Sequence, residues 1–113
     1  MSLGHNDRVA GWVIELRATL ADAGLLVDRG RTAFDSDRAL PLAFEALCNR
    51  VGELCKKLVE SQPEAFQHPV FRQAIRNRNF VVHQYHQIDL DALWATVTDG
   101  FAELARELED ART

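Results

Sequence analysis

The amino-acid sequence predicts an all-α protein, an antiparallel four-helix up-down bundle with one short extra helical turn. Three observations lead to this fold class. Apolar residues recur at steps of three and four along most of the 113-residue chain, no segment alternates like a β-strand, and the connections are fairly short. Hydrophobic residues make up 47% and charged residues 27%, as in an ordinary globular protein. The length suits one domain over residues 1–113, with 1–5 and 110–113 expected to fray.

The first two helices follow from their apolar stripes. Asn6 or Asp7 is the expected N-cap of the first helix, and the stretch "DRGRTAFDSD" at 28–37 is predicted to be a loop. Ser36 or Asp37 is expected to open the second helix, with Pro41 in its first turn. The stripes are Val9, Trp12, Val13, Leu16, Leu20, Ala23 and Val27 in the first helix, and Leu40, Phe44, Leu47, Val51, Leu54 and Leu58 in the second.

The second half of the chain predicts two more long helices. The prolines of "SQPEAFQHP" interrupt the pattern and favour a short helical turn near 63–67. The third helix is expected from Pro69 to about His83, and the fourth after Asp89 as its N-cap. The stripe of the fourth helix is Leu90, Leu93, Trp94, Val97, Phe101, Leu104 and Leu108.

The two cysteines predict a reduced, cytoplasmic protein. Cys48 and Cys55 are seven residues apart on one predicted helix, about 10.5 Å in rise, whereas a disulfide needs Cα atoms within about 7 Å. We expect both to be small packing residues. No CxxC or HxxxH pattern accompanies them, so no metal or other cofactor is expected. The longest apolar run is far short of the about 20 residues that span a bilayer, and no signal peptide is expected before the first helix.

An arginine interrupts the apolar stripe of the third helix. A buried guanidinium needs a partner, so Arg78 is expected either beside a carboxylate such as Glu45 or Glu53, or in a polar cleft. On one straight helix His83 would lie about 140° around the axis from Arg78. The two can converge if the helix ends near His83 or if two copies meet, and Asn79 could orient the imidazole. The stripe is Phe71, Ile75, Arg78, Val82 and Tyr85.

Charge is unevenly distributed along the chain. The formal net charge is −4, yet no Asp or Glu occurs between Ala65 and Ile88. A locally positive strip on an acidic domain suits phosphate, while the acidic total argues against extensive nonspecific duplex binding. The basic residues and histidines of this window are His68, Arg72, Arg76, Arg78, His83 and His86.

The segment "RNRNFVVHQYHQID" at 76–89 carries an R-x4-H-x-Y motif formed by Arg78, His83 and Tyr85. This motif resembles that of the HepT-type toxins of the HEPN superfamily. The likeness extends to "IRNRNFVVHQYHQIDLDALWATV" at 75–97 and to "VGELCKKL" at 51–58, and in diffuse form it covers most of the chain.

The resemblance implies a dimeric HEPN-like bundle whose motifs face each other. It implies a metal-independent ribonuclease toxin whose partner is an MntA-type nucleotidyltransferase antitoxin that adenylylates the motif tyrosine. Arg78 and His83 would then be catalytic and Tyr85 the modified residue. Supporting or RNA-binding roles would fall to Arg76, Asn79 and His86. Asn79 matches the polar residue that commonly follows the motif arginine, whereas His86 lies where the family pattern is loose, and its role stays open.

This chemistry is physically reasonable. RNA is cut without a metal when its 2′-hydroxyl attacks the adjacent phosphate, which requires a proton acceptor or donor with a pKa near neutrality, such as imidazole. The planar guanidinium suits the charge that develops on the phosphorane-like transition state. AMP on Tyr85 would add negative charge and bulk to the same cleft.

Two other interpretations remain open from the sequence. The chain could be a non-catalytic module that binds a nucleotidyltransferase and presents its substrate. It could also be a dimeric helical scaffold in which arginine and histidine have structural roles only.

Overall fold

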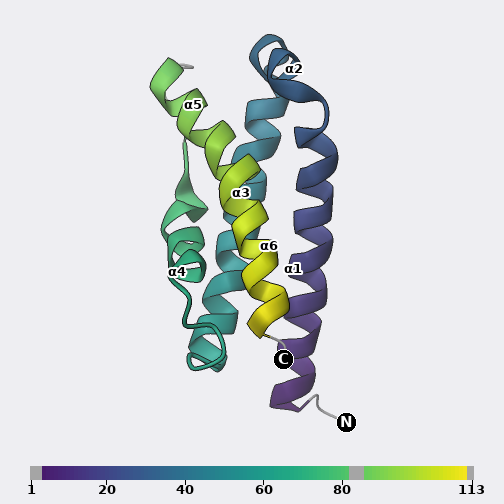
Figure 1. Cartoon of the computed structure of the whole chain (residues 1–113), viewed down its shortest axis with the longest axis vertical. Helices are drawn as coiled ribbons and strands as arrows, with labels where there is room; N and C mark the ends of the chain where they lie inside the picture. Colours follow the sequence, from purple (N-terminus) through teal and green to yellow (C-terminus); the bar gives the residue numbers. More distant parts are fainter. Residues whose placement is uncertain (1–3, 82–85, 112–113) are drawn as a thin grey trace.

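The computed structural model describes residues 4–81 and 86–111, which form helices and turns with no strand among them. The first two rods are the long helices α1 (His5–Val27) and α3 (Ala39–Ser61). A short helix, α2 (Gly30–Ser36), connects them at the upper end of the molecule in Figure 1.

The third rod is shorter and changes its helix type. After a turn at 63–66 the chain forms α4 (Pro69–Arg76), which continues as the 3-10 helix η1 (Asn77–Asn79). The fourth rod is continuous, because α5 (Gln87–Ala95), the π-helical segment η2 (Thr96–Gly100) and α6 (Phe101–Ala111) follow one another directly.

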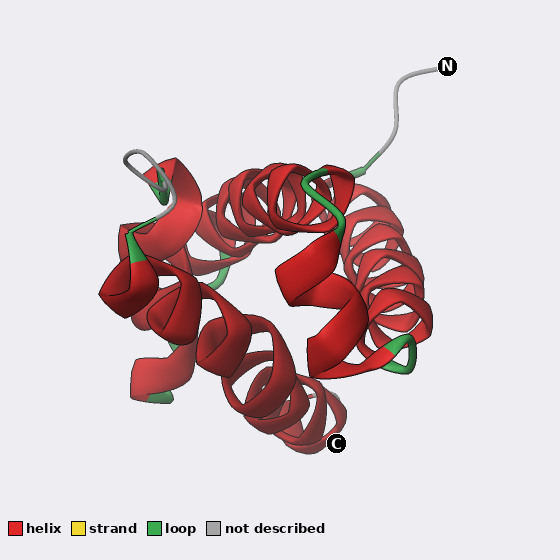
Figure 2. Ribbon diagram, turned by 90° about the horizontal axis from the view of Figure 1, so that it is seen from above, coloured by secondary structure: helices red, strands yellow, loops and turns green. Residues whose placement is uncertain are grey.

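The rods run up, down, up and down, as the sequence predicted (Figure 1). Seen from above, they surround a common axis, with α1 and α4 on opposite sides of the bundle (Figures 1 and 2). The molecule is elongated, with extents of 47 × 25 × 22 Å. No helix among the described residues is long and apolar enough to cross a membrane.

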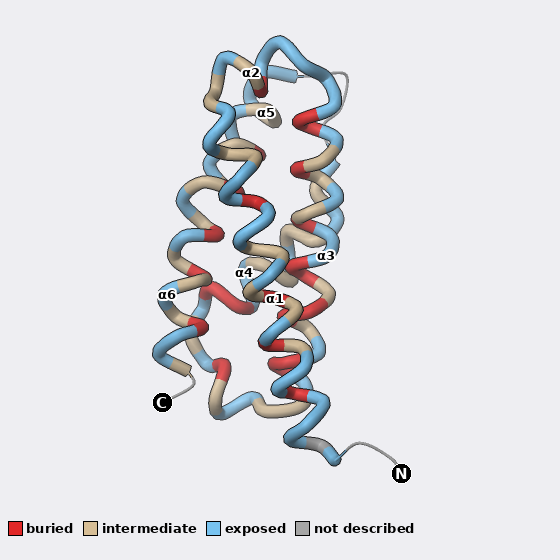
Figure 3. The backbone as a smooth tube through the Cα atoms, turned by 90° about the vertical axis from the view of Figure 1, so that its right-hand side faces the viewer, coloured by how far each residue is buried: buried red, intermediate tan, exposed pale blue. Residues whose placement is uncertain are grey.

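The core lies around α3, which contacts α1, α4, η1 and α5. In Figure 3 the buried stretches of the backbone face the interior of the bundle. Aromatic rings close its upper end, where the Phe44 ring is 4.9 Å from Phe34 and 5.9 Å from Trp94 between centroids. The predicted stripes supply most of the buried side chains, including Leu16, Phe44, Val51, Leu54, Leu58, Leu93, Leu104 and Leu108.

Two predictions for the N-terminal half of the chain were wrong. Helix α1 begins at His5 after Gly4, which has no side-chain capping bond, so neither Asn6 nor Asp7 is the N-cap. The predicted loop at 28–37 contains α2. This short helix forms because Gly30 adopts φ 89°, which lets the chain turn sharply after α1, and because Phe34 is buried in the core.

The predicted start of the next long helix is correct only in part. Helix α3 begins at Ala39 with Arg38 as its N-cap residue, two or three residues later than predicted, although the side chain of Asp37 accepts a hydrogen bond of 2.9 Å from the backbone N–H of Ala39. Pro41 lies in the first turn, as predicted. The 63–66 segment is a hydrogen-bonded turn, in which the Ala65 amide donates to the Gln62 carbonyl at 3.1 Å.

The cysteines are the packing residues that the sequence predicted. Cys48 and Cys55 are both buried in α3 and both are free thiols. Burial raises the pKa of Cys48, helped by the charge of Glu45, and that of Cys55, each to about 12. Neither thiol is therefore prepared for nucleophilic chemistry near neutral pH.

Candidate active site

The third helix ends earlier than predicted. Helix α4 stops at Arg76, η1 follows, and Phe80 already has the extended backbone angles φ −60° and ψ 125°. Local sequence explains the break, because Asn77 and Asn79 favour turns, and Phe80 and the β-branched Val81 and Val82 come next in the sequence. The straight helix that was predicted to run from Pro69 to about His83 therefore ends with η1 at Asn79, before the chain reaches the end of the described segment at Val81.

A glycine lets η1 approach α3 very closely. A Cβ atom on Gly52 would be 2.7 Å from the Ala74 carbonyl oxygen and 3.0 Å from the Arg78 Cα, and it would overlap the Arg78 Cβ. Any larger residue would push η1 away from α3. Gly52 therefore fixes how deeply Arg78 sits beside the bundle.

Contacts with α3 and α4 hold the Arg78 side chain. Its Nε lies 3.2 Å from Glu53 Oε1, and its Nη1 donates a 2.9 Å hydrogen bond to the Ile75 carbonyl. Asn49 Nδ2 donates to the Arg78 carbonyl at 3.2 Å. The carboxylate partner is thus Glu53, one of the two candidates named from the sequence. The Arg78 side chain is 28% exposed, so the guanidinium is oriented without being enclosed.

An open groove of about 440 Å³ runs between α3 and η1 at this point. Its polar lining consists of Glu45, Asn49, Arg78 and Asn79. Two large apolar side chains on the same groove are exposed, Leu42 at 57% and Val81 at 54%. The groove therefore combines an oriented cation with uncovered apolar surface.

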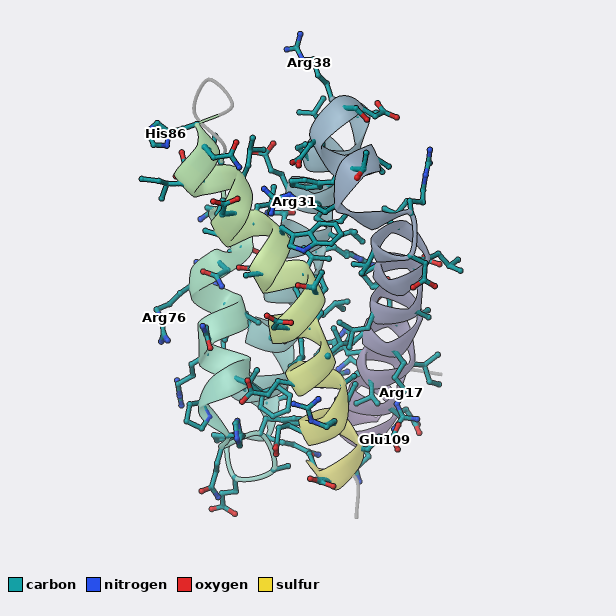
Figure 4. All side chains as sticks on the ribbon, turned by 45° about the horizontal axis from the view of Figure 1, so that its top comes forward. Arg17, Arg31, Arg38, Arg76, His86 and Glu109 are labelled. Carbon is teal, nitrogen blue, oxygen red and sulfur yellow. The ribbon has the colours of Figure 1, made fainter. Side chains whose placement is uncertain are left out.

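The other predicted site residues are distributed unevenly. His83 and Tyr85 lie outside the described residues. Asn79 shares the groove with Arg78, whereas Arg76 is exposed on α4 and points away from the bundle in Figure 4. His86 lies at the start of α5 and is exposed.

His86 has a local structural task. Its Nδ1 accepts a 3.2 Å hydrogen bond from the Ile88 amide, so it is the N-cap of α5. The prediction that Asp89 caps this helix was wrong, and Asp89 instead lies in the first turn. His68 caps α4 in the same way, with Nδ1 accepting from the Val70 amide at 3.1 Å. Sequence reasoning missed both caps because histidine is not a preferred N-cap residue.

Sequence reasoning also missed an arginine clamp between α2 and α5. Arg31 Nη2 is 2.5 Å from Asp91 Oδ1, its Nε is 2.9 Å from Asp35 Oδ1, and its guanidinium lies 5.8 Å from the Trp94 ring centroid. Hydrogen bonds to Asp35 and then Asp91 raise the pKa of Arg31. Hydrogen bonds from Arg31 and then Gln87 lower the pKa of Asp91. Only the i, i+4 spacing of Arg31 and Asp35 could have hinted at this clamp.

Comparison with known proteins agrees with the sequence motif. Two proteins of Methanocaldococcus jannaschii, the candidate RNases MJ1216 and MJ0125, are each 26% identical to the chain over 76 residues. The alignments cover 67% of this chain and 63% and 66% of those relatives, so the chain spans slightly less than two thirds of their length. No solved structure matches the chain significantly. Residues 16–111 match the family model described as Ribonuclease HepT-like, and the chain therefore belongs to the HepT-like ribonuclease family.

Proposed function

We propose that this protein is a metal-independent endoribonuclease toxin of a toxin–antitoxin pair, with Arg78 and His83 as its catalytic residues. The family assignment supports ribonuclease activity. The main structural support for a specific catalytic residue is the placement of Arg78. Its side chain is held by Glu53 and the Ile75 carbonyl, yet it remains open to a groove.

Arg78 is suited to stabilise a phosphate. A guanidinium has five N–H donors in a planar fork, and Arg78 directs its Nε donor toward Glu53 and one Nη1 donor toward the Ile75 carbonyl. The remaining donors can bind the equatorial oxygens of the phosphorane. Because Glu53 and Ile75 fix the side chain beforehand, little reorganisation is needed when negative charge develops.

His83 would move the proton. Imidazole can accept the proton of the 2′-hydroxyl or donate one to the 5′-oxygen leaving group, since its ordinary pKa is about 6.5. Cleavage by 2′-hydroxyl attack breaks the P–O5′ bond and leaves a cyclic 2′,3′-phosphate. In this mechanism His83 transfers the proton, and Arg78 stabilises the negative charge of the transition state.

We further propose that two copies close over the groove as a homodimer. The exposed side chains of Leu42 and Val81 flank the polar lining, and a two-fold axis beside Arg78 would cover them in both copies. Such a dimer would place two arginines and two histidines around one scissile phosphate. Arg76 and Asn79 are proposed to bind neighbouring RNA phosphates, and His86 to support the site by capping α5.

The proposed partner is an MntA-type nucleotidyltransferase antitoxin that transfers AMP from ATP to the hydroxyl of Tyr85. The phenolic oxygen attacks the α-phosphate of ATP, and pyrophosphate leaves. The attached AMP brings a negative phosphate into the region of Arg78, where it would compete with RNA for the same cation.

The experiment that tests the catalytic proposal uses purified protein and a labelled single-stranded RNA. We expect cleavage by wild type, loss of cleavage in His83→Ala, and full cleavage in the matched control His68→Ala, whose histidine caps α4. Products should carry a cyclic 2′,3′-phosphate. If wild-type protein binds the nucleotidyltransferase but never cuts RNA, the non-catalytic binding module is the better description.

Mixing variants tests the shared site of the dimer. An equimolar refolded mixture of Arg78→Ala and His83→Ala subunits contains heterodimers that retain one Arg78 and one His83 on different chains. We expect partial recovery of cleavage in the mixture. No recovery, despite heterodimers detected by mass, would show that each chain acts with its own residues alone.

A further inference from the structure

Three residues of α3 contact three different parts of Arg78. Gly52 lets the Arg78 Cβ approach the helix, and Glu53 lies 3.2 Å from the guanidinium. One turn earlier on α3, Asn49 Nδ2 donates a 3.2 Å hydrogen bond to the Arg78 backbone carbonyl. The contacts with Gly52 and Glu53 place the residue and its charge, whereas the contact with Asn49 holds the main chain where it leaves the helix.

The Arg78 carbonyl lies at the C-terminal end of η1. The last carbonyl groups of a helix have no partner within the helix, because the amides that would bond to them lie beyond its end. The Asn77 carbonyl still accepts a 3.1 Å hydrogen bond from the Phe80 amide. The next carbonyl, that of Arg78, accepts its bond from Asn49. A side chain of α3 therefore caps the end of η1.

The residue type at position 49 also indicates a role beyond helix formation. Asparagine has a low helix propensity, because its side chain competes for backbone hydrogen bonds. Asn49 is nevertheless exposed in the middle of α3. The other exposed residues of this helix are stronger helix formers, namely Ala39, Leu42, Ala46, Arg50, Lys57 and Glu60. Helix α3 thus has a weak helix former at the exposed position whose side chain bonds to the Arg78 carbonyl.

The chain that leaves η1 leads to His83. Phe80 has the extended backbone angles φ −60° and ψ 125°, and His83 follows three residues later in the sequence. Three residues span at most about 11 Å, so a rotation of about 10° at the end of η1 moves the far end by up to about 2 Å. A displacement of about 1 Å at a reacting group can cost about 100-fold in rate. Proton transfer therefore depends on the direction in which the chain leaves η1.

We propose that Asn49 is a positioning residue for the ribonuclease reaction. By holding the Arg78 carbonyl it fixes the direction in which the chain leaves η1 toward His83. This inference rests on the proposed function, in which His83 moves the proton. Asn49 acts through the main chain, and it neither transfers a proton nor stabilises the phosphate.

The Asn49 bond contributes little to the stability of the bundle. It lies at the surface, so water can replace the amide of Asn49 as the donor to the Arg78 carbonyl. Leucine or alanine at position 49 would also favour the helix more than asparagine does. Loss of the amide should therefore leave the unfolding free energy close to that of wild type while the end of η1 becomes less restrained. This separation of effects distinguishes a positioning role from a general structural one.

Amide hydrogen exchange measured by NMR tests whether Asn49 holds the end of η1. The Phe80 amide is the probe, because its hydrogen bond to the Asn77 carbonyl closes the last turn of η1. We expect its exchange in Asn49→Leu to be about fivefold faster than in wild type, the factor that corresponds to one ordinary hydrogen bond. Asn49→Gln, which keeps an amide donor, and the control Glu60→Leu, an exposed site farther along α3, should exchange like wild type. Unchanged exchange in Asn49→Leu would overturn the inference.

Cleavage kinetics test whether this restraint matters for the reaction. In Asn49→Leu we expect kcat to fall about tenfold or more and KM to stay near its wild-type value, because a positioning residue acts on the transition state more than on RNA binding. Asn49→Gln should recover most of kcat. Chemical denaturation should show that Asn49→Leu is about as stable as wild type. A folded Asn49→Leu protein with wild-type kcat, or one whose loss lies only in KM, would overturn the positioning role.

The two measurements separate this inference from the function on which it rests. If wild-type protein cuts no RNA, the proposed function fails, while exchange at Phe80 still decides whether Asn49 holds the end of η1. If exchange is faster in Asn49→Leu but the variant cuts RNA as fast as an active wild type, Asn49 has a structural role only and the positioning role is wrong. Faster exchange together with a lower kcat is the result that supports it.

Discussion

Gly52 and Arg78 are in such close contact that no side chain can exist at position 52 without displacing η1. A Cβ atom there would be 3.0 Å from the Arg78 Cα and 2.7 Å from the Ala74 carbonyl oxygen. Both neighbours are backbone atoms, which cannot rotate away as the end of a side chain would. The next residue, Glu53, holds the Arg78 guanidinium at 3.2 Å. Two successive residues of α3 therefore determine where Arg78 lies and where it points.

Gly52→Ala should therefore move Arg78 and reduce RNA cleavage while the bundle persists. Overpacking of this kind costs about 1–3 kcal/mol of unfolding free energy. The matched control is Gly24→Ala, because a Cβ at Gly24 meets nothing within 4 Å and helical alanine is favoured over glycine by up to about 1 kcal/mol. Chemical denaturation and cleavage rates measure both effects. A Gly52→Ala protein as stable and active as wild type would show that η1 adjusts freely.

The Arg31–Asp91 clamp predicts a pH dependence of stability. Arg31 and Gln87 hold the pKa of Asp91 below its ordinary value of 3.8 in the folded protein. A lowered carboxyl pKa stabilises the fold above the ordinary value, and this contribution is lost as the pH falls through the folded value. The difference in unfolding free energy between wild type and Asp91→Asn should thus be constant near neutrality and shrink below about pH 4. A difference that grows on acidification would contradict the clamp.

Tyr85→Phe should separate cleavage from neutralisation. The phenol has no assigned acid–base role, so the variant should retain most of the nuclease activity. Incubation with the cognate nucleotidyltransferase, ATP and magnesium should add the mass of AMP to wild type and suppress its cleavage, but leave Tyr85→Phe unmodified and active. Intact mass spectrometry measures the modification of both proteins, and cleavage rates measure its effect on nuclease activity. An equal mass gain in the variant would place the modification on another residue.

Much of the fold could be predicted because amphipathic helices of this length can be recognised from the spacing of their apolar residues alone. The stripe from Leu40 to Leu58 became the centre of the core, and the topology followed from short connections. Helix α2 could not be predicted in this way, since seven residues are too few for a periodic pattern and its formation depends on burial of Phe34.

The fourth rod contains a π-helical segment that was not predicted from the sequence. The sequence predicted one regular helix, but η2 widens it to a π-helical turn between Thr96 and Gly100. Leu93, Val97 and Phe101 are separated by two successive steps of four and are all buried. A wider turn keeps such residues on one face, and the hydroxyl of Thr98 bonds to the Trp94 carbonyl at 2.8 Å beside it.

The candidate site was predictable in its residues more than in its geometry. The sequence named Arg78 and its possible partner Glu53, and the structure confirms that pair. The end of α4 before Arg78 was missed, because the apolar stripe continues through Val82 in the sequence although the backbone has already left the helix at Phe80. Helical periodicity cannot detect a break when the residues beyond it are also apolar.

The most direct test of the central claim compares RNA cleavage by wild type, Arg78→Lys and Arg78→Ala under conditions in which all three proteins are folded. Lysine keeps the charge but lacks the planar fork, so Arg78→Lys should lose about 100-fold or more in cleavage rate and Arg78→Ala at least as much. Because the Arg78–Glu53 pair is partly exposed, the stability of both variants should fall by no more than about 1 kcal/mol. Cleavage by either folded variant at the wild-type rate would contradict the assignment of Arg78 as a catalytic residue.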